Sequence, residues 1–223
     1  MDCAAIWDWD GVVIDSSRQH EESRERLAAE IGKPLPADHF ERGFGKKNKI
    51  IIPNILNWSH DEEEVERLGR RKEAIYRQMM IEEGMLPDLI PGVKDFLQAL
   101  RQAGIPSVVG TSTERENVYA IFKLLGLSDL FVGMVASEDV EHGKPDPEVF
   151  LKGAAIAGFP PAQCVVFEDS IHGLQAGLAG GMKVVGVATT HEPDILYREG
   201  AHQVIPHFME LNPGFLNLLF EEQ

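Results

Sequence analysis

The chain has 223 residues, of which 21 are lysine or arginine and 36 are aspartate or glutamate, so its formal charge is −15. Such an acidic surface repels nucleic-acid backbones and anionic lipid head groups, so neither nucleic acid nor a membrane is an expected partner. A hydrophobic content of 43% and a charged content of 26% are typical of a globular enzyme and exclude a disordered chain.

No apolar run reaches the ~18–20 residues of a membrane-spanning helix, and the acidic N-terminus is unlike a signal peptide. Cys3 and Cys164 each begin a short apolar run, and we expect two reduced thiols in the core rather than a disulfide or a metal-binding pair. These features predict a cytoplasmic protein, with a monomer as the favoured oligomeric state.

Six short apolar runs alternate with helical patterns along the chain. Runs rich in valine and isoleucine, without polar alternation, are typical of strands buried on both faces of a parallel sheet. The predicted strands are 4–7, 106–109, 131–135, 164–167, 183–187 and 203–205. The predicted helices between them are 93–103, 114–125, 147–157, 171–180 and 193–199. This alternation predicts an α/β core with a doubly wound, Rossmann-like parallel sheet.

The segment from residue 17 to residue 88 contains no convincing strand. Its helical patterns cover about 17–31, 47–58 and 61–83, and prolines interrupt it. An all-helical insert directly after the first strand indicates a second, smaller domain. We therefore predict a core of residues 1–16 and 89–223 and a helical cap of residues 17–88, joined by linkers near 16 and 88.

Two acidic pairs follow predicted strands. The first is in Asp8-Trp9-Asp10-Gly11, where residues i and i+2 of a strand point to the same face and the glycine permits a sharp turn. The second is Glu168-Asp169. A strand-ending turn is the alternative interpretation of the first pair, although its residues favour a functional one. A helix N-cap is the alternative for the second pair, but it explains one acid better than two. Two such pairs at one edge of a sheet repel each other and indicate a cation, and oxygen ligands suit Mg²⁺.

A hydroxyl cluster and a lysine follow the same pattern. Thr111-Ser112-Thr113 lies between a predicted strand and a predicted helix, where hydroxyl groups bind phosphate or simply cap the helix. Lys144 lies in Gly143-Lys144-Pro145-Asp146-Pro147, in which two prolines stiffen the backbone, and this favours a functional lysine over a solvated one. One site explains these features more simply than four independent coincidences.

In order and spacing, the four motifs resemble those of the haloacid dehalogenase superfamily, over nearly the whole chain. The helical insert is similar to the four-helix cap of the branch that contains β-phosphoglucomutases and sugar-phosphate phosphatases. The resemblance implies a Mg²⁺-dependent phosphohydrolase that acts on a small phosphomonoester, a sugar phosphate, through an aspartyl phosphate. The alternatives are a β-phosphoglucomutase-like mutase and, more remotely, a non-catalytic regulator that binds a phosphosugar.

The resemblance also implies roles for single residues. Asp8 would be the nucleophile, and Asp10 would protonate the leaving oxygen and later activate water. Asp8, Glu168 and Asp169 would ligate Mg²⁺, together with the backbone carbonyl of Asp10. The residues expected to contact the phosphoryl group are Asp8, Gly11, Thr111, Ser112 and Lys144.

Three residues of the predicted cap are candidates for substrate binding. Lys72 resembles a lysine that faces the active site in the β-phosphoglucomutase branch, and His20 matches a cap histidine of that branch near the hinge. Lys46 belongs to a basic island, residues 42–49, that also contains Gly45. The family pattern has arginine where Lys46 stands, and a solvated helix end is the alternative interpretation of this island.

Overall fold

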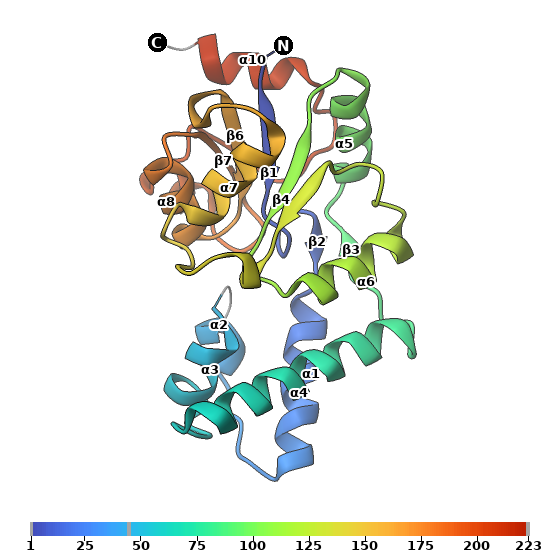
Figure 1. Ribbon diagram of the computed structural model, residues 1–223, viewed down its shortest axis with the longest axis vertical. Helices are drawn as coiled ribbons and strands as arrows, with labels where there is room; N and C mark the ends of the chain where they lie inside the picture. Colours follow the sequence, from blue (N-terminus) through green and yellow to red (C-terminus); the bar gives the residue numbers. More distant parts are fainter. Residues whose placement is uncertain (1, 44–45, 222–223) are drawn as a thin grey trace.

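A computed structural model of the chain describes residues 2–43 and 46–221. Six parallel strands form the central sheet of the larger lobe (Figure 1). Their order is β5 (Gly133–Val135), β4 (Ser107–Gly110), β1 (Ala4–Trp7), β6 (Cys164–Glu168), β7 (Lys183–Val187) and β8 (Gln203–Ile205). The six predicted strands are therefore confirmed. The strand predicted over 131–135 begins only at Gly133, because Phe131 packs below the sheet on Phe122 and Val132 is exposed in a bend.

Helices cover both faces of this sheet. One face carries α5 (Val93–Gln102), α6 (Arg115–Leu125) and α10 (Gly214–Glu221). The other carries α7 (Glu148–Ala157), α8 (Ile171–Ala179) and α9 (Pro193–Arg198). Ile6 and Trp7 are neighbours on β1 and enter different core clusters, as alternation along a buried strand requires. The short helix α10 was absent from the predicted elements.

Four helices form a separate layer at one end of the sheet (Figure 1). They are α1 (Ser17–Ile31), α2 (His39–Gly43), α3 (Asn48–Asn54) and α4 (Glu62–Ile81). Helices α1, α3 and α4 share an apolar cluster of their own, which includes Leu27, Leu68 and Met79. The helix predicted over 47–58 is shorter than expected, and Asn57 after it has a left-handed backbone with φ of +52°, which a right-handed helix cannot include. Helix α2 was not predicted.

A small two-stranded antiparallel sheet lies where the linkers were predicted. In it, β2 (Ile14–Asp15) pairs with β3 (Asp88–Leu89). The two connections between the helical layer and the sheet therefore run side by side. The exact domain boundaries at 16/17 and 88/89 remain a prediction.

The expectation of two reduced thiols in the core agrees with the structure. Cys3 and Cys164 are buried and free, and both belong to the core clusters. Among the helices of the described ranges, none is long and apolar enough to cross a membrane.

Gly92 and Gly104 both have a left-handed backbone but differ in the space beside it. Gly92 has φ of +80°, and a Cβ added there would lie 2.6 Å from the carbonyl carbon of Phe208. Gly104 has φ of +73°, and a Cβ added there would meet no described atom within 4 Å. We predict that Gly104→Ala lowers the free energy of unfolding by about 1 kcal/mol and Gly92→Ala by about 3 kcal/mol, because the second change adds a backbone clash. Urea unfolding measures both, and equal losses would contradict the clash.

Candidate active site

Three neighbouring strands bring the predicted residues together at their carboxyl ends. The order β4-β1-β6 places these ends side by side. Asp8 follows β1, Thr111 follows β4, and Glu168 is the last residue of β6. A cavity of about 730 Å³ opens at this edge, lined by residues of the sheet edge and of the helical layer. Its position agrees with the rule that open α/β sheets bind ligands beyond the carboxyl ends of their strands.

Lys144 lies at the centre of the charged groups. Its Nζ is 2.9 Å from Oδ1 of Asp8 and 2.6 Å from Oε1 of Glu168, and it lies 4.7 Å from the ring centroid of Phe150. Burial opposes its charge, but the two carboxylates raise the pKa of Lys144 above its usual value. The lysine is therefore a buried, permanent positive charge beside Asp8.

Three buried carboxylates surround one point next to this lysine. Asp8, Glu168 and Asp169 each offer an oxygen, and these oxygens lie within 4.8 Å of one another. Burial, reinforced by Glu168, raises the pKa of Asp8 to about 7 and that of Asp169 well above its usual value. Oδ2 of Asp169 is buried and has no hydrogen-bond partner among the described residues. An orphaned oxygen among acidic groups that resist ionisation fits a hard divalent cation such as Mg²⁺.

Gly11 lets Asp169 come close to the loop that follows β1. Its φ is +81°, and an added Cβ would lie 2.6 Å from Cγ of Asp169. The Gly11 carbonyl accepts a hydrogen bond of 2.6 Å from Thr189. Gly11 is not among the described residues that line the cavity, so its observed part is in the backbone turn, and its predicted contact with the phosphoryl group remains a prediction.

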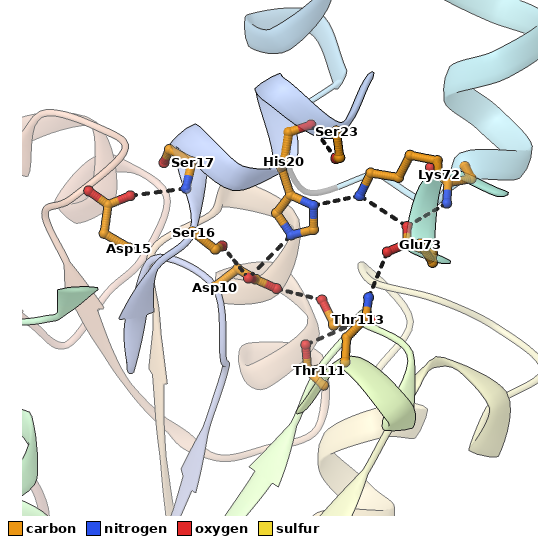
Figure 2. A network of polar contacts seen from close by, with 12 residues as sticks. Asp10, Asp15, Ser16, Ser17, His20, Ser23, Lys72, Glu73, Thr111 and Thr113 are labelled. Carbon is orange, nitrogen blue, oxygen red and sulfur yellow. Dashed lines mark hydrogen bonds and ion pairs between the residues drawn. The ribbon is translucent and has the colours of Figure 1, made fainter. Parts of the chain in front are cut away.

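Asp10 points toward the helical layer, as Figure 2 shows. Its carboxylate accepts hydrogen bonds from the hydroxyls of Ser16 and Thr113, and Oδ1 lies 3.4 Å from Nε2 of His20. Burial opposes ionisation of Asp10, but His20 and the two hydroxyls lower its pKa to about 2. The carboxylate is thus held in its ionised form, apart from the three-carboxylate group. The predicted metal contact through the Asp10 carbonyl remains a prediction.

A chain of polar contacts leads from Asp10 into the helical layer (Figure 2) and ends at α6 of the core. Nδ1 of His20 is 2.6 Å from Nζ of Lys72, which donates to Oε1 of Glu73 at 3.0 Å. Oε2 of Glu73 accepts from Nδ2 of Asn117 on α6 at 2.6 Å. Because a charged lysine only donates, Nδ1 of His20 accepts and Nε2 carries the proton toward Asp10. Burial and Lys72 lower the pKa of His20, which favours this neutral form.

Asn117 is held from both sides by α4. Its Oδ1 accepts from Nη1 of Arg77 at 2.8 Å while its Nδ2 donates to Glu73. Glu73 also accepts from Asn48 of α3 at 2.7 Å. Sequence reasoning missed Ser16, Glu73 and Asn117 as site residues. Glu73 had one available signal, its position next to Lys72, but nothing local in the sequence marked Asn117.

The remaining predicted residues also line the cavity. Thr111 is buried, and its hydroxyl oxygen accepts from a backbone N–H two residues later at 3.1 Å. Ser112 lines the cavity beside it, and α6 begins only at Arg115, so this hydroxyl run precedes the helix rather than capping it. Lys46 lines the cavity while its Nζ donates to a backbone carbonyl four residues earlier at 2.6 Å. Gly45 of the basic island lies outside the described residues.

The raised pKa of Asp8 predicts a pH-dependent stability of the metal-free protein. Between its ordinary value of 3.8 and about 7, the folded protein holds a proton that the unfolded chain has lost, so stability falls as pH rises through this range. In EDTA, we predict that Asp8→Asn raises the free energy of unfolding at pH 7 by on the order of 2 kcal/mol and reduces its pH slope.

Asp10→Asn is the matched control for this measurement. The pKa of Asp10 is lowered from 3.8 to about 2, so its stabilisation is complete above pH 3.8 and is lost only as pH falls toward 2. Asp10→Asn should therefore lower stability evenly between pH 4.5 and 7 and leave the slope unchanged. Urea unfolding across this range tests both variants, and an unchanged slope in Asp8→Asn would contradict the assignment.

Comparison with known proteins agrees with this geometry. Residues 4–181 match the family model described as haloacid dehalogenase-like hydrolase. The chain is 36% identical over 203 residues to the chloroplastic 5-amino-6-(5-phospho-D-ribitylamino)uracil phosphatase of Arabidopsis thaliana. The match covers 90% of the chain and 53% of that relative, so the chain spans about half the length of the relative. It is 32% identical over 189 residues to the β-phosphoglucomutase of Bacillus subtilis strain 168, covering 82% of each.

A solved structure extends the similarity to the whole fold. The crystal structure of a HAD hydrolase, family IA, variant 3, from Entamoeba histolytica superposes with a TM-score of 0.87 at 28% identity, covering 97% of this chain and 98% of that one. This coverage includes both the sheet and the helical layer. The chain therefore belongs to the haloacid dehalogenase-like hydrolases, in the branch of β-phosphoglucomutases and sugar-phosphate phosphatases, and is an enzyme of the phosphatase and phosphotransferase type.

Proposed function

We propose that the chain is a Mg²⁺-dependent phosphatase of a small phosphomonoester, a sugar phosphate, and that Asp8 carries the phosphoryl group as an aspartyl phosphate. The observation that carries the proposal is the buried carboxylate of Asp8 at 2.9 Å from Lys144, with Glu168 and Asp169 around it. The names of the two relatives support a small phosphorylated substrate, since one acts on a phosphoribityl compound and the other on a phosphoglucose.

The proposed site places positive charge beside the phosphoryl group before the reaction begins. Asp8, Glu168 and Asp169, with the Asp10 carbonyl, would hold Mg²⁺, which supplies positive charge against the transferring phosphoryl group. Lys144 adds a fixed positive charge at the same point. The groups proposed to hold the phosphoryl oxygens are Thr111, Ser112 and Lys144, with the Gly11 backbone beside them.

Asp8 and Asp10 divide the chemistry between them. An oxygen of Asp8 attacks phosphorus while the bond to the substrate oxygen breaks, and Asp10 gives its proton to that leaving oxygen. Water then attacks the phosphorus of the aspartyl phosphate, gives a proton to Asp10 and releases phosphate, which restores Asp8. With a pKa of about 2, the resting Asp10 is ionised. The approach of a phosphate dianion raises that pKa and favours the acid form needed in the first step.

We assign substrate enclosure to residues 17–88, acting as a cap over the core of residues 1–16 and 89–223. His20 holds Asp10 in place from the cap side, and Lys72 supports His20. Lys46 reaches the same cavity from the loop before α3. A cap that excludes water protects the aspartyl phosphate until the chosen acceptor is in place.

The proposed setting is the cytoplasm, where the chain would act as a monomer on a small metabolite. Two free buried thiols suit a reducing compartment. The formal charge of −15 disfavours nucleic acids and anionic membranes as partners.

A panel of sugar phosphates, assayed with Mg²⁺ and with EDTA, tests the proposal. We expect inorganic phosphate to accumulate only with Mg²⁺, Asp8→Asn to abolish turnover, and Asp10→Asn to lower kcat by about 10²–10⁴-fold. NMR of the sugar product scores the mutase alternative, which His20 and Lys72 favour. An isomerised sugar phosphate as the main product would establish a mutase, and normal turnover by Asp8→Asn would overturn the covalent mechanism.

The contact between Glu73 and Asn117 permits a donor–acceptor exchange experiment. Asn117→Asp places a second carboxylate against Glu73, and we expect kcat/KM to fall about tenfold because the cap contact is weakened. Glu73→Gln restores a donor, so the double variant should recover part of that loss. The control is Glu116→Gln, because the side chain of Glu116 is exposed and, like that of Asn117, contacts Arg77. Steady-state kinetics decide, and a double variant no better than Asn117→Asp would refute the coupling.

A further inference from the structure

The turn that follows β7 contacts the backbone of both acidic loops. It covers residues 188–191, and β7 is the neighbour of β6 in the sheet. The hydroxyl of Thr189 donates to the carbonyl of Gly11 at 2.6 Å, and the hydroxyl of Thr190 donates to the carbonyl of Asp169 at 2.9 Å. No residue of this turn is among the described residues that line the cavity. The two threonines therefore reach the site through Gly11 and Asp169 and not by contact with a ligand.

The backbone of this turn is itself anchored to the sheet. The N–H of Ala188 donates to the carbonyl of Ile205 at the end of β8, at 2.8 Å. The N–H of Thr189 donates to the carbonyl of Val187 at the end of β7, at 2.9 Å. The hydroxyls of the turn are thus presented from a support that is hydrogen-bonded to two strands.

The two acidic residues after the centre of β6 are held in different ways. The carboxylate of Glu168 accepts from the N–H and the hydroxyl of Ser170, at 2.6 and 2.9 Å, and from Lys144 at 2.6 Å. Oδ2 of Asp169, by contrast, is buried without a partner among the described residues. The carbonyl oxygen of Asp169 instead accepts from the hydroxyl of Thr190. Glu168 is therefore held at its carboxylate by its own loop and by Lys144, whereas Asp169 is held at its backbone by the turn after β7.

Gly11 and Asp169 lie directly against each other between the two threonine contacts. A Cβ added at Gly11 would lie 2.6 Å from Cγ of Asp169, so the carboxylate occupies the space beside the glycine. Ionised carboxylates of Asp8 and Asp169 repel each other, and a mobile loop would let Asp169 move away. One turn that holds the carbonyls of Gly11 and Asp169 opposes this separation. Ligands that are already in place lower the cost of binding a cation.

We propose that Thr189 and Thr190 are positioning residues of the candidate metal site, and that they hold Asp169 and the loop after β1 at the separation that a divalent cation requires. Groups that orient metal ligands from behind commonly contribute about 10–100-fold to metal affinity. The simpler interpretation is that both hydroxyls only complete a turn, in which case metal affinity would not depend on them. This inference rests on the Mg²⁺ site of the proposed function, but not on the phosphatase reaction.

Mn²⁺ binding, followed by electron paramagnetic resonance of the free ion, tests the role without turnover. Thr190→Val removes the hydroxyl and retains the branched shape, and we expect the Mn²⁺ dissociation constant to rise about tenfold. Nδ1 of His191 lies 3.2 Å from the same carbonyl and retains part of the support, so the loss is not complete. Thr190→Ser keeps the donor and should bind Mn²⁺ within about twofold of the wild type. Asp169→Asn removes a ligand and identifies the binding that belongs to this site.

Tyr197→Phe is the matched control. The hydroxyl of Tyr197 also contacts a backbone group beside the sheet, since it accepts from the N–H of Val204 at 3.3 Å, but it lies outside the described cavity lining. This variant should bind Mn²⁺ as the wild type does. Wild-type affinity in Thr190→Val, an equal loss in Thr190→Ser, or an equal loss in Tyr197→Phe would each overturn the positioning role.

Thr189→Val gives a second, independent measurement. It should also weaken Mn²⁺ binding, because it releases the loop after β1 from the same turn. Since both hydroxyls hold one separation, the double variant with Thr190→Val should lose less affinity than the product of the two single losses. Losses that multiply in full would contradict a shared role.

The same proteins separate this inference from the proposed function. Phosphate release from p-nitrophenyl phosphate with Mg²⁺ reports the chemistry at Asp8. Turnover by the wild type, together with unchanged Mn²⁺ affinity in Thr190→Val, would reject the positioning role alone. Weaker Mn²⁺ binding by Thr190→Val, in a protein that releases no phosphate, would reject the phosphatase function and retain the positioning role. A wild type that binds no Mn²⁺ would overturn both.

Discussion

Lys144 forms ion pairs with Asp8 and Glu168 at the edge where β1 and β6 end, and the rest of the site depends on this contact. One lysine cannot offset three buried carboxylates, and burial, reinforced by Glu168, raises the pKa of Asp8 to about 7 despite the lysine. The sheet keeps the groups together nevertheless. The rings of Trp7 on β1 and Phe167 on β6 stack with their centroids 4.4 Å apart. This packing in the core fixes the spacing of the carboxylates at the ends of the two strands.

The cap meets this edge through a second set of charges. Asp10 and Asn117 both belong to the sheet side, and the contacts that join them pass through His20, Lys72 and Glu73 of the helical layer. The cap therefore contacts the core at two points that share one hydrogen-bonded chain. A movement of the cap away from the sheet would therefore also change the contacts that hold the ionised Asp10 in place.

The sequence reveals those parts of the site that depend on local order, and it misses those that depend on packing. The apolar runs identified six strands because parallel strands are buried on both faces. That β4, β1 and β6 are neighbours is seen only in the structure, since no local pattern states strand order. Asn117 meets Glu73 across 44 positions of the chain, and no periodicity reports such a contact. From the sequence, Arg24 is one of several charges on a polar helix, but in the structure it is buried beside Phe40 and Gly43.

The charge at the carboxyl edge of the sheet differs from the average charge of the chain in what it requires. Asp8, Glu168 and Asp169 are buried close to one another, and Lys144 offsets only part of their charge. A divalent cation bound there would supply the missing positive charge, and the same edge would then attract a phosphate group. The formal charge of −15 therefore argues against polyanions as partners but not against a small anionic substrate, because the local sign at this edge depends on the cation.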